Sequence, residues 1–307
     1  MDREEVLRVK EAFNLMNLHD NYEEMLNNAA RAIYAYTVHN PGIKSLVVGM
    51  SGGIDSAVTA WIMHEAAPRA GVYTRGYCLP IISNHPDETK RGMDVGKAFL
   101  RQCDLVDLSE DFVHLVKALD KELYDAMWYS TTLKGDEGKQ VKIRLGNMKA
   151  RLRMMYLYDR AKKYDGIVMS TDNLTEYLLG FWTLHGDVGD FGPIQNLYKT
   201  EVYGIANWLI NDSDRHTVPK TLRPTMDPMP TDGLGIGNGD LAQLLPDWKG
   251  TYIEGYREID KELIRYQKDS PRSNRRLGTV AHRHIQTKFK RENPYSPSRE
   301  ELLEEWS

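Results

Sequence analysis

The fold is decided by the stretch Val47-Val48-Gly49-Met50-Ser51-Gly52-Gly53-Ile54-Asp55-Ser56. The apolar run at residues 45–50 predicts a buried strand of a parallel sheet, and residues 57–63 predict a helix. The glycines between them allow close backbone approach, and the first turn of the helix offers unpaired N–H groups and the positive end of its dipole. The turn therefore predicts an anion site that suits a phosphate.

Asp55 predicts a metal beside that phosphate. The turn is not the Walker pattern, because no Gly-Lys-Ser/Thr follows the glycines. A carboxylate inside a phosphate site would be repelled unless a cation lay between the two groups, so we interpret Asp55 as a Mg²⁺ ligand. A glycine-rich turn with a solvated Asp is the alternative. The complete Ser-Gly-Gly-x-Asp-Ser pattern in a strand–turn–helix context disfavours it.

The same motif resembles the pyrophosphate loop of the N-type ATP pyrophosphatases. The resemblance implies an enzyme that cleaves ATP to AMP and pyrophosphate while it adenylates an oxygen. It also implies the adenine nucleotide alpha hydrolase-like fold.

Composition excludes several other classes of protein. The 307 residues are 41% hydrophobic and 27% charged, with a net charge of −4, so the chain as a whole has no electrostatic attraction for nucleic acid or membranes. The two cysteines, Cys78 and Cys103, are too few for a disulfide framework or a zinc site and favour a cytoplasmic location. No apolar run approaches the roughly 18 residues that span a bilayer.

Strand and helix alternate along the chain, with strands expected at residues 45–50, 72–79, 104–108 and 166–170. This order predicts an α/β protein with a doubly wound parallel sheet and helices on both faces. We expect one domain over residues 1–307, with N-terminal helices at 1–40, an α/β core at 41–210 and a C-terminal extension at 211–307 that packs on the site. Polar loops are expected at 130–140 and 171–193, and a long helix at 141–163.

A second carboxylate is expected at the same edge of the sheet. Binding sites of such folds lie beyond the carboxyl ends of the strands, where the Ser51 turn, Leu79 and Ser170 are all expected. If the fourth strand neighbours the first, Glu176 faces Asp55 across the crevice, and the two hold Mg²⁺ together with a triphosphate. Alternatively, Glu176 only complements the dipole at the start of a helix.

Further segments resemble the NAD synthetase family and match it in order over residues 20–240. The similar segments are 147–154 (NMKARLRM), 170–176 (STDNLTE), 180–183 (GFWT), 186–190 (GDVGD), 224–227 (PTMD) and 234–237 (LGIG). The resemblance implies amidation of deamido-NAD by ammonia through an adenylated intermediate, with ATP and Mg²⁺, in a homodimer.

The resemblance also implies roles for individual residues. Asp55 and Glu176 would bind the metal. The catalytic set would be Asp55, Glu176, Lys199 and Asp187. ATP would contact Gly49, Met50, Ser51, Gly52, Gly53, Ile54, Asp55, Ser56, Leu79, Thr171, Lys199 and Thr225. Deamido-NAD would contact Asn147, Arg151, Leu184 and Asp190. Without the match in register, Arg151 is a solvated or ion-paired helix residue, and Asp187 and Asp190 are turn residues.

The sequence departs from the family at three places that bear on the substrate. Leu184 stands where many members carry Lys, and Gly186-Asp187-Val188-Gly189-Asp190 is one residue shorter than the usual loop. We align the family's His-Lys-Arg with Asn274-Arg275-Arg276. These residues belong to a basic segment, 272–291, that we interpret as a strand or loop closing over the anionic substrates; a solvated basic face or a nucleic-acid patch are the alternatives.

Two other functions compete. One is another N-type ATP pyrophosphatase: a GMP synthetase-like enzyme, a tRNA-modifying ligase or a thiolation enzyme. The lack of paired catalytic cysteines disfavours thiolation, and the net charge of −4 disfavours a tRNA ligase. The other is a nucleotide-binding module without catalysis, which the combination of Asp55, Glu176 and Lys199 disfavours.

The expected nitrogen source is free ammonia. Glutamine-using synthetases carry a glutaminase domain with a catalytic cysteine, whereas only about fifty residues precede Ser51, far fewer than a domain needs, and no cysteine follows residue 250. Asp187 or Asp190 is expected to take the proton as ammonium becomes ammonia.

Overall fold

Four parallel strands form the centre of the protein. The computed structural model describes residues 17–82, 84–129, 135–211, 218–226, 240–268 and 278–303. The strands are β1 (Ser45–Gly49), β2 (Tyr73–Cys78), β3 (Gln102–Leu105) and β4 (Gly166–Met169), in the spatial order β3-β2-β1-β4. Within the sheet, Ser45 of β1 pairs with Tyr73 of β2 on one side and with Gly166 of β4 on the other. β4 therefore neighbours β1, which is the condition for Glu176 to face Asp55.

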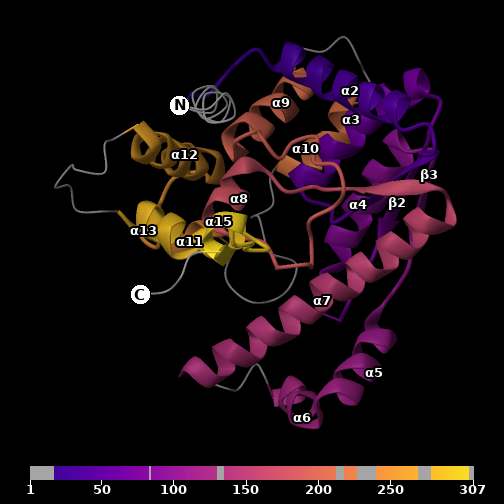
Figure 1. The fold of residues 1–307 in the computed structure, drawn as a ribbon. Coiled ribbons are helices and arrows are strands. Elements are labelled where there is room, and N and C mark those ends of the chain that lie inside the picture. Colours follow the sequence, from indigo (N-terminus) through magenta and orange to yellow (C-terminus); the bar gives the residue numbers. More distant parts are fainter. Residues whose placement is uncertain are drawn as a thin grey trace.

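Helices cover both faces of the sheet, because alternate side chains of β1 join different cores. Leu46 and Val48 lie in a core with α2 (Tyr22–His39), α3 (Ile54–Ala70), α4 (Pro86–Phe99) and α9 (Lys199–Asn211). Val47 lies in the other core, with α5 (Ser109–Leu119), α6 (Lys121–Tyr129) and α7 (Gly135–Lys163). Both faces of a central parallel strand are thus apolar, as its sequence indicates. The predicted doubly wound fold is confirmed (Figure 1).

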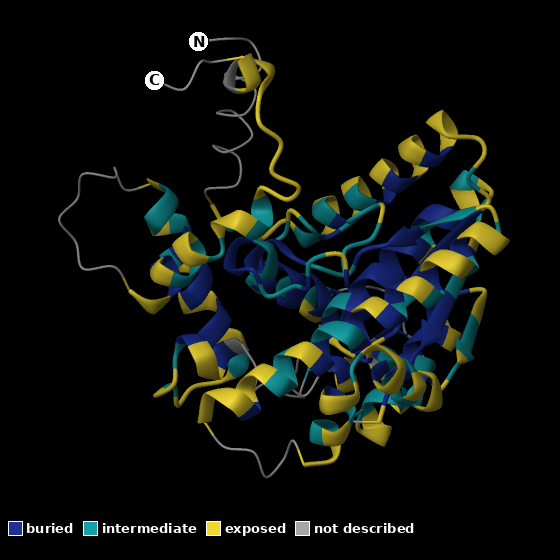
Figure 2. Cartoon of the chain, turned by 60° about the horizontal axis from the view of Figure 1, so that its bottom comes forward, coloured by how far each residue is buried: buried dark blue, intermediate teal, exposed yellow. Residues whose placement is uncertain are grey.

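The C-terminal helices share the first of these cores. Those that contribute to it are α10 (Val218–Met226), α11 (Asp240–Leu244), α12 (Tyr252–Lys268) and α13 (Thr279–Gln286); α14 (Lys288–Arg291) and α15 (Arg299–Leu303) follow them. Buried Leu222, Leu244, Ile259 and Val280 lie in the same core as buried side chains of α3 and α9. Figure 2 shows the buried residues gathered around the sheet and on the inner sides of the helices. This packing supports the proposed single domain.

Three expectations of local structure need correction. Residues 135–140 form the first turns of α7 rather than a polar loop, since Asp136 and Glu137 suit the start of a helix. The expected loop at 171–193 contains α8 (Leu174–Leu179). The part of the basic segment that the structure describes, 278–291, is helical rather than a strand or loop. No helix of the described residues is long and apolar enough to cross a membrane.

Candidate active site

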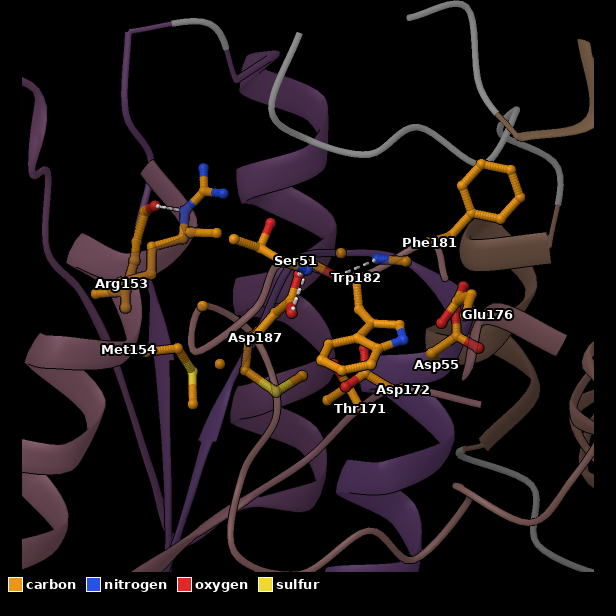
Figure 3. A pocket seen from close by; sticks show the side chains of 18 of the residues that line it. Ser51, Asp55, Arg153, Met154, Thr171, Asp172, Glu176, Phe181, Trp182 and Asp187 are labelled. Atoms are coloured by element: carbon orange, nitrogen blue, oxygen red, sulfur yellow. Dashed lines mark hydrogen bonds between the residues drawn. The ribbon is translucent and has the colours of Figure 1, made fainter. Parts of the chain in front are cut away.

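A cleft of about 720 Å³ opens at the carboxyl ends of the strands. Its walls come from the β1–α3 turn, the residues that follow β2, helices α7, α8 and α9, the loop 180–187, and α13–α14 at the C-terminus. Figure 3 shows labelled side chains of the β1–α3 turn, α7, α8 and the loop 180–187 around one space. The predicted nucleotide residues that line it are Gly49, Met50, Ser51, Gly52, Gly53, Ile54, Asp55, Leu79, Thr171, Lys199 and Thr225.

The β1–α3 turn has the geometry of an anion site. Gly52 has φ +82°, and a Cβ at this position would lie 2.1 Å from the carbonyl oxygen of Glu88, so only glycine fits beneath α4. Arg91 donates to the Gly52 carbonyl at 3.2 Å and holds the turn from above. Helix α3 begins directly afterwards, at Ile54, and its N-cap Gly53 and first residues Ile54 and Asp55 line the cleft, where a helix N-terminus favours an anion.

Ser51 and Ser56 have different places in this turn. Ser51 is exposed, and its hydroxyl lies 3.1 Å from that of Ser56. Ser56 is 1% exposed and does not line the cleft; its hydroxyl donates to the Gly53 carbonyl at 3.0 Å. Ser56 therefore supports the turn from behind, while Ser51 faces the space that a ligand would fill.

The centre of the cleft is an ionic cluster of Asp55, Glu176 and Lys199. The Lys199 Nζ atom lies 2.5 Å from Asp55 Oδ2 and 3.2 Å from Glu176 Oε1. Burial lowers the pKa of Lys199, but the carboxylates of Asp55 and Glu176 outweigh it and hold the pKa well above its usual value. Burial raises the pKa of Glu176, and Lys199 opposes that shift. The amine therefore stays charged at neutral pH although its side chain is only 2% exposed.

Glu176 is fixed by the start of α8. The Asn173 side chain accepts from the Glu176 N–H at 3.0 Å, and Glu176 Oε2 accepts from the Asn173 N–H at 3.3 Å, which completes a capping box. The Asn173 side chain also donates to Asp55 Oδ1 at 2.9 Å. Glu176 therefore begins a helix, as one interpretation expects, and it shares Lys199 with Asp55; its role as a metal ligand stays a prediction.

The C-terminal extension supports Lys199 from behind. Asp260 of α12 is fully buried and accepts from the Thr175 hydroxyl at 2.5 Å and the Thr200 N–H at 2.9 Å. The Thr175 oxygen in turn accepts from the Lys199 N–H at 2.8 Å. Burial raises the pKa of Asp260 to about 6. The first residues of α9 are therefore held by the carboxylate of Asp260, which lies 60 positions after Thr200 in the sequence.

Two more acids lie on the other side of the cluster. Asp187 accepts twice from the Thr183 N–H, at 2.8 and 3.0 Å, and burial raises its pKa to about 7. Burial also raises the pKa of Asp172, and the nearby charges of Asp187 and Glu176 add to the shift. The loop itself is joined to α7, because the Thr183 hydroxyl donates to Asn147 at 3.1 Å. Asp187 and Asn147 thus lie where the sequence predicts them, in the wall of the cleft.

Three of the predicted substrate residues do not line the cleft. Arg151 is exposed and donates through Nε and Nη2 to the Leu184 carbonyl, at 3.3 and 3.2 Å. Asp190 accepts from the Val168 N–H at 2.9 Å and the Tyr158 hydroxyl at 3.0 Å, so it fastens the loop to β4 and α7. Their roles with substrate, and that of Leu184, stay predictions.

The cleft also contains cations that the motifs did not single out. Arg153 donates to the Leu79 carbonyl at 3.0 Å and to Asn84 at 2.7 Å. Lys290 of α14 donates to the Gly180 carbonyl at 2.6 Å, and the Arg283 guanidinium lies 3.7 Å from the centroid of Phe181. The predicted Asn274-Arg275-Arg276 alignment lies outside the described residues. The only sequence signal for Lys290 and Arg283 was their place in the basic segment.

A comparison with family models identifies residues 26–294 as NAD synthase. The chain belongs to the NAD synthase family. An NH₃-dependent NAD⁺ synthetase of Methanocaldococcus jannaschii is 32% identical over 250 residues, which are 81% of this chain and 83% of the relative. The resemblance to NAD synthetases that the motifs indicated is therefore confirmed, and the expectation of an enzyme with it.

Solved structures agree with this fold. An NMN synthetase from Francisella tularensis is 25% identical, with a TM-score of 0.67 over 91% of this chain and 99% of that one. An NAD⁺ synthetase from Burkholderia pseudomallei is 22% identical, with a TM-score of 0.61 over 94% of this chain and 96% of that one. The second likeness concerns the fold alone.

Proposed function

We propose that this protein is an ammonia-dependent NAD synthetase, which converts the carboxylate of deamido-NAD to an amide while ATP becomes AMP and pyrophosphate. The observation that carries the proposal is the Asp55–Lys199–Glu176 cluster at the mouth of a pyrophosphate turn, in a member of the NAD synthase family. Related proteins named as NH₃-dependent synthetases support ammonia as the nitrogen source.

Asp55 and Glu176 fit a Mg²⁺ ion that is shared with ATP. Among the described residues, no group of three or more His, Cys, Asp or Glu could hold a metal without help. Mg²⁺ is commonly bound through one or two carboxylates together with substrate phosphates, and this pair supplies two such carboxylates beside the turn. A bound Mg²⁺ would offset the negative charge of the triphosphate as pyrophosphate leaves.

The protein's own groups have separate tasks in the reaction. The β1–α3 turn binds the phosphates through backbone N–H groups, and the charged Lys199 amine offsets the charge that gathers as the substrate carboxylate attacks the α-phosphorus. Asp187, whose pKa is about 7, accepts a proton from ammonium at neutral pH. The free ammonia then attacks the acyl carbon, the amide forms, and AMP leaves.

One observation favours a second candidate substrate, nicotinate mononucleotide. Arg151, Leu184 and Asp190 are the residues that the family resemblance assigns to deamido-NAD, and they lie outside the cleft lining. The Francisella protein that resembles this chain is named an NMN synthetase. Amidation of the smaller substrate would need only the groups that do line the cleft.

A turnover assay tests both candidates. The purified protein is given ATP, Mg²⁺ and ammonium with either deamido-NAD or nicotinate mononucleotide, and AMP and the amide product are measured. We expect AMP and NAD in equal amounts from deamido-NAD, and almost no product when glutamine replaces ammonium. A larger kcat/KM for the mononucleotide would establish the second candidate, and no AMP from either substrate would refute both.

We further propose a cytoplasmic homodimer. Exposed apolar side chains lie on α7, where Met155 is 63% and Tyr158 42% exposed, and on α2, where Val38 is 53% exposed. Sedimentation equilibrium of the wild-type protein tests the assembly, because a monomer at micromolar concentration would refute it.

A further inference from the structure

Trp182 carries a polar group that none of the described residues satisfies. Its indole Nε1 atom is buried and has no hydrogen-bond partner in the part of the chain that the structure describes. The side chain lines the cleft, and in the view of Figure 3 the indole lies between Asp187 and the Asp55–Glu176 pair, with its nitrogen on the side of that pair. Buried donors without partners are rare in native proteins, so this one requires an explanation.

Several contacts fix the indole in this position. Its ring is stacked on that of Tyr177, with the planes 12° apart and the centroids 6.3 Å apart. Lys290 lies 5.6 Å from the Trp182 ring centroid and donates to the Trp182 carbonyl at 2.5 Å. Contacts to both the ring and the backbone of Trp182 therefore fix the donor in an orientation in which no described residue accepts from it.

The position of Trp182 indicates the chemistry of its missing partner. An indole N–H only donates, so the partner is an acceptor atom of a ligand. In the proposed reaction the substrate carboxyl group must reach the α-phosphorus beside Asp55 and Glu176, and also the ammonia released beside Asp187. Trp182 lines the same cleft as these acids, and in the view of Figure 3 its indole is drawn between the two places.

We propose that the Trp182 indole N–H donates a hydrogen bond to the pyridine-carboxylate oxygen of the substrate, the oxygen that stays on carbon and becomes the amide oxygen. This inference rests on the proposed function and adds a substrate-binding residue to it. A donor at that oxygen orients the carboxyl group for adenylation. It also stabilises the negative charge that gathers on the same oxygen when ammonia attacks.

Trp182→Phe tests the donor, because the substitution removes the N–H and keeps a flat apolar ring. Loss of a hydrogen bond to a charged oxygen should lower kcat/KM for the pyridine nucleotide by about tenfold or more, while the KM for ATP changes less than twofold. The Tm should fall only by the packing that the smaller ring loses against Tyr177, since the folded protein loses no hydrogen bond. Turnover within twofold of wild type would overturn the proposal.

Trp248→Phe is the matched control. The Trp248 Nε1–H donates to the Thr251 carbonyl at 2.9 Å, and the residue lies outside the cleft lining. This substitution removes a hydrogen bond that the fold uses, so it should lower the Tm slightly and leave kcat/KM unchanged. If the Trp182 donor binds a ligand, kcat/KM therefore falls in the Trp182→Phe variant and stays unchanged in the Trp248→Phe variant.

A measurement without turnover separates this proposal from the proposed function. In ¹⁵N-labelled protein, which has six tryptophans, the Trp182 indole signal is the one absent from the Trp182→Phe spectrum. Adding deamido-NAD or nicotinate mononucleotide should move that signal in the direction of hydrogen bonding. Adding ATP alone should not. Nucleotide binding that leaves the signal in place would overturn the assignment even in an active enzyme, and a shift in an inactive protein would leave only the reaction refuted.

Discussion

The Lys199 amine lies 2.5 Å from the carboxylate of Asp55, although the two residues are 144 positions apart in the sequence. Asp55 begins the helix that follows the central strand, and Lys199 begins α9. Their contact joins α3 to α9, two helices that contribute to the first core, and both residues line the cleft. We therefore expect stability and function to depend on the same ion pair.

We expect Lys199→Met to lose both stability and turnover. Removing the amine leaves the carboxylates of Asp55 and Glu176 buried without their cation, which typically costs about 3–5 kcal/mol. Added Mg²⁺ should restore part of this loss by binding the same two carboxylates, so the Tm should rise more with Mg²⁺ in the variant than in wild type. Thermal unfolding with and without Mg²⁺ measures the difference, and equal shifts in both proteins would contradict the metal assignment.

Asp55→Asn should abolish AMP formation in a folded protein. The amide keeps the size of the side chain but removes the charge, and the expected loss in kcat is at least on the order of 100-fold, comparable with removal of one preorganised electrostatic contact. Asp111→Asn is the control, because Asp111 is an exposed acid in the first turn of α5. Near-normal turnover by the Asp55 variant would remove this residue from the catalytic set.

Asp187 should make the folded protein less stable as the pH rises toward 7. Its pKa is raised from 3.8 to about 7, so the folded state binds a proton that the unfolded state has released above about pH 4. This contribution to the free energy of unfolding is complete below pH 4 and is lost as the pH rises through 7.

Urea unfolding at intervals of about one pH unit between about pH 4.5 and 8.5, without nucleotide or metal, measures how the free energy of unfolding depends on pH. Relative to wild type, Asp187→Asn should gain at least about 1 kcal/mol across the range, the equivalent of one pKa unit. Asp260 titrates in both proteins and cancels in the difference. A difference between the two proteins that does not vary with pH would mean that Asp187 ionises normally.

Asp260→Asn should displace Lys199 without touching the substrate. The carboxylate holds Thr175 and Thr200, and an amide has one acceptor oxygen where the present contacts use two. We expect a loss of stability of about 1–3 kcal/mol and a lower kcat. Thr200→Val, which removes only the hydroxyl contact, should lose less of both. Full activity in a destabilised Asp260 variant would show that this network supports the fold alone.

The sequence predicts the parts of the site that are local. The turn at residues 49–56 is contiguous in the sequence, so the strand before it, its glycines and the helix after it together predict its structure. The pairing of Glu176 with Asp55 depends on β4 lying next to β1, and no local pattern states that order. The sequence therefore predicted that Glu176 faces Asp55 only if β4 lies next to β1. The strand order meets this condition.

A C-terminal extension that packs on the site was expected, but the residues through which it contributes depend on tertiary structure and were not predicted. From the sequence, Asp260 is one acid on an amphipathic helix. Its burial depends on the packing of α12 against α9, which no local pattern predicts. Lys290 and Arg283 were grouped with a basic segment whose helices were not expected. The prediction of a loop at residues 135–140 was wrong for another reason. A polar composition is typical of a loop but also of an exposed helical turn.

The neighbouring arginines of α7 distinguish the two candidate substrates. Arg151 is exposed and lies outside the cleft lining, whereas Arg153 is part of it. If deamido-NAD is the substrate, Arg151→Ala should raise its KM about tenfold, the cost of one charged hydrogen bond, and leave the KM for ATP within twofold. If nicotinate mononucleotide is the substrate, Arg151→Ala should change neither KM, because the smaller molecule ends inside the cleft.

Arg153→Ala is the matched variant on the same helix. It frees the Leu79 carbonyl and Asn84 in the wall of the cleft, so it should weaken ATP whichever pyridine nucleotide is used. Initial rates with each substrate varied in turn give the KM values. Equal losses for ATP and deamido-NAD in the Arg151 variant would count against a specific contact, and would mean that its bond to the Leu184 carbonyl only holds the loop.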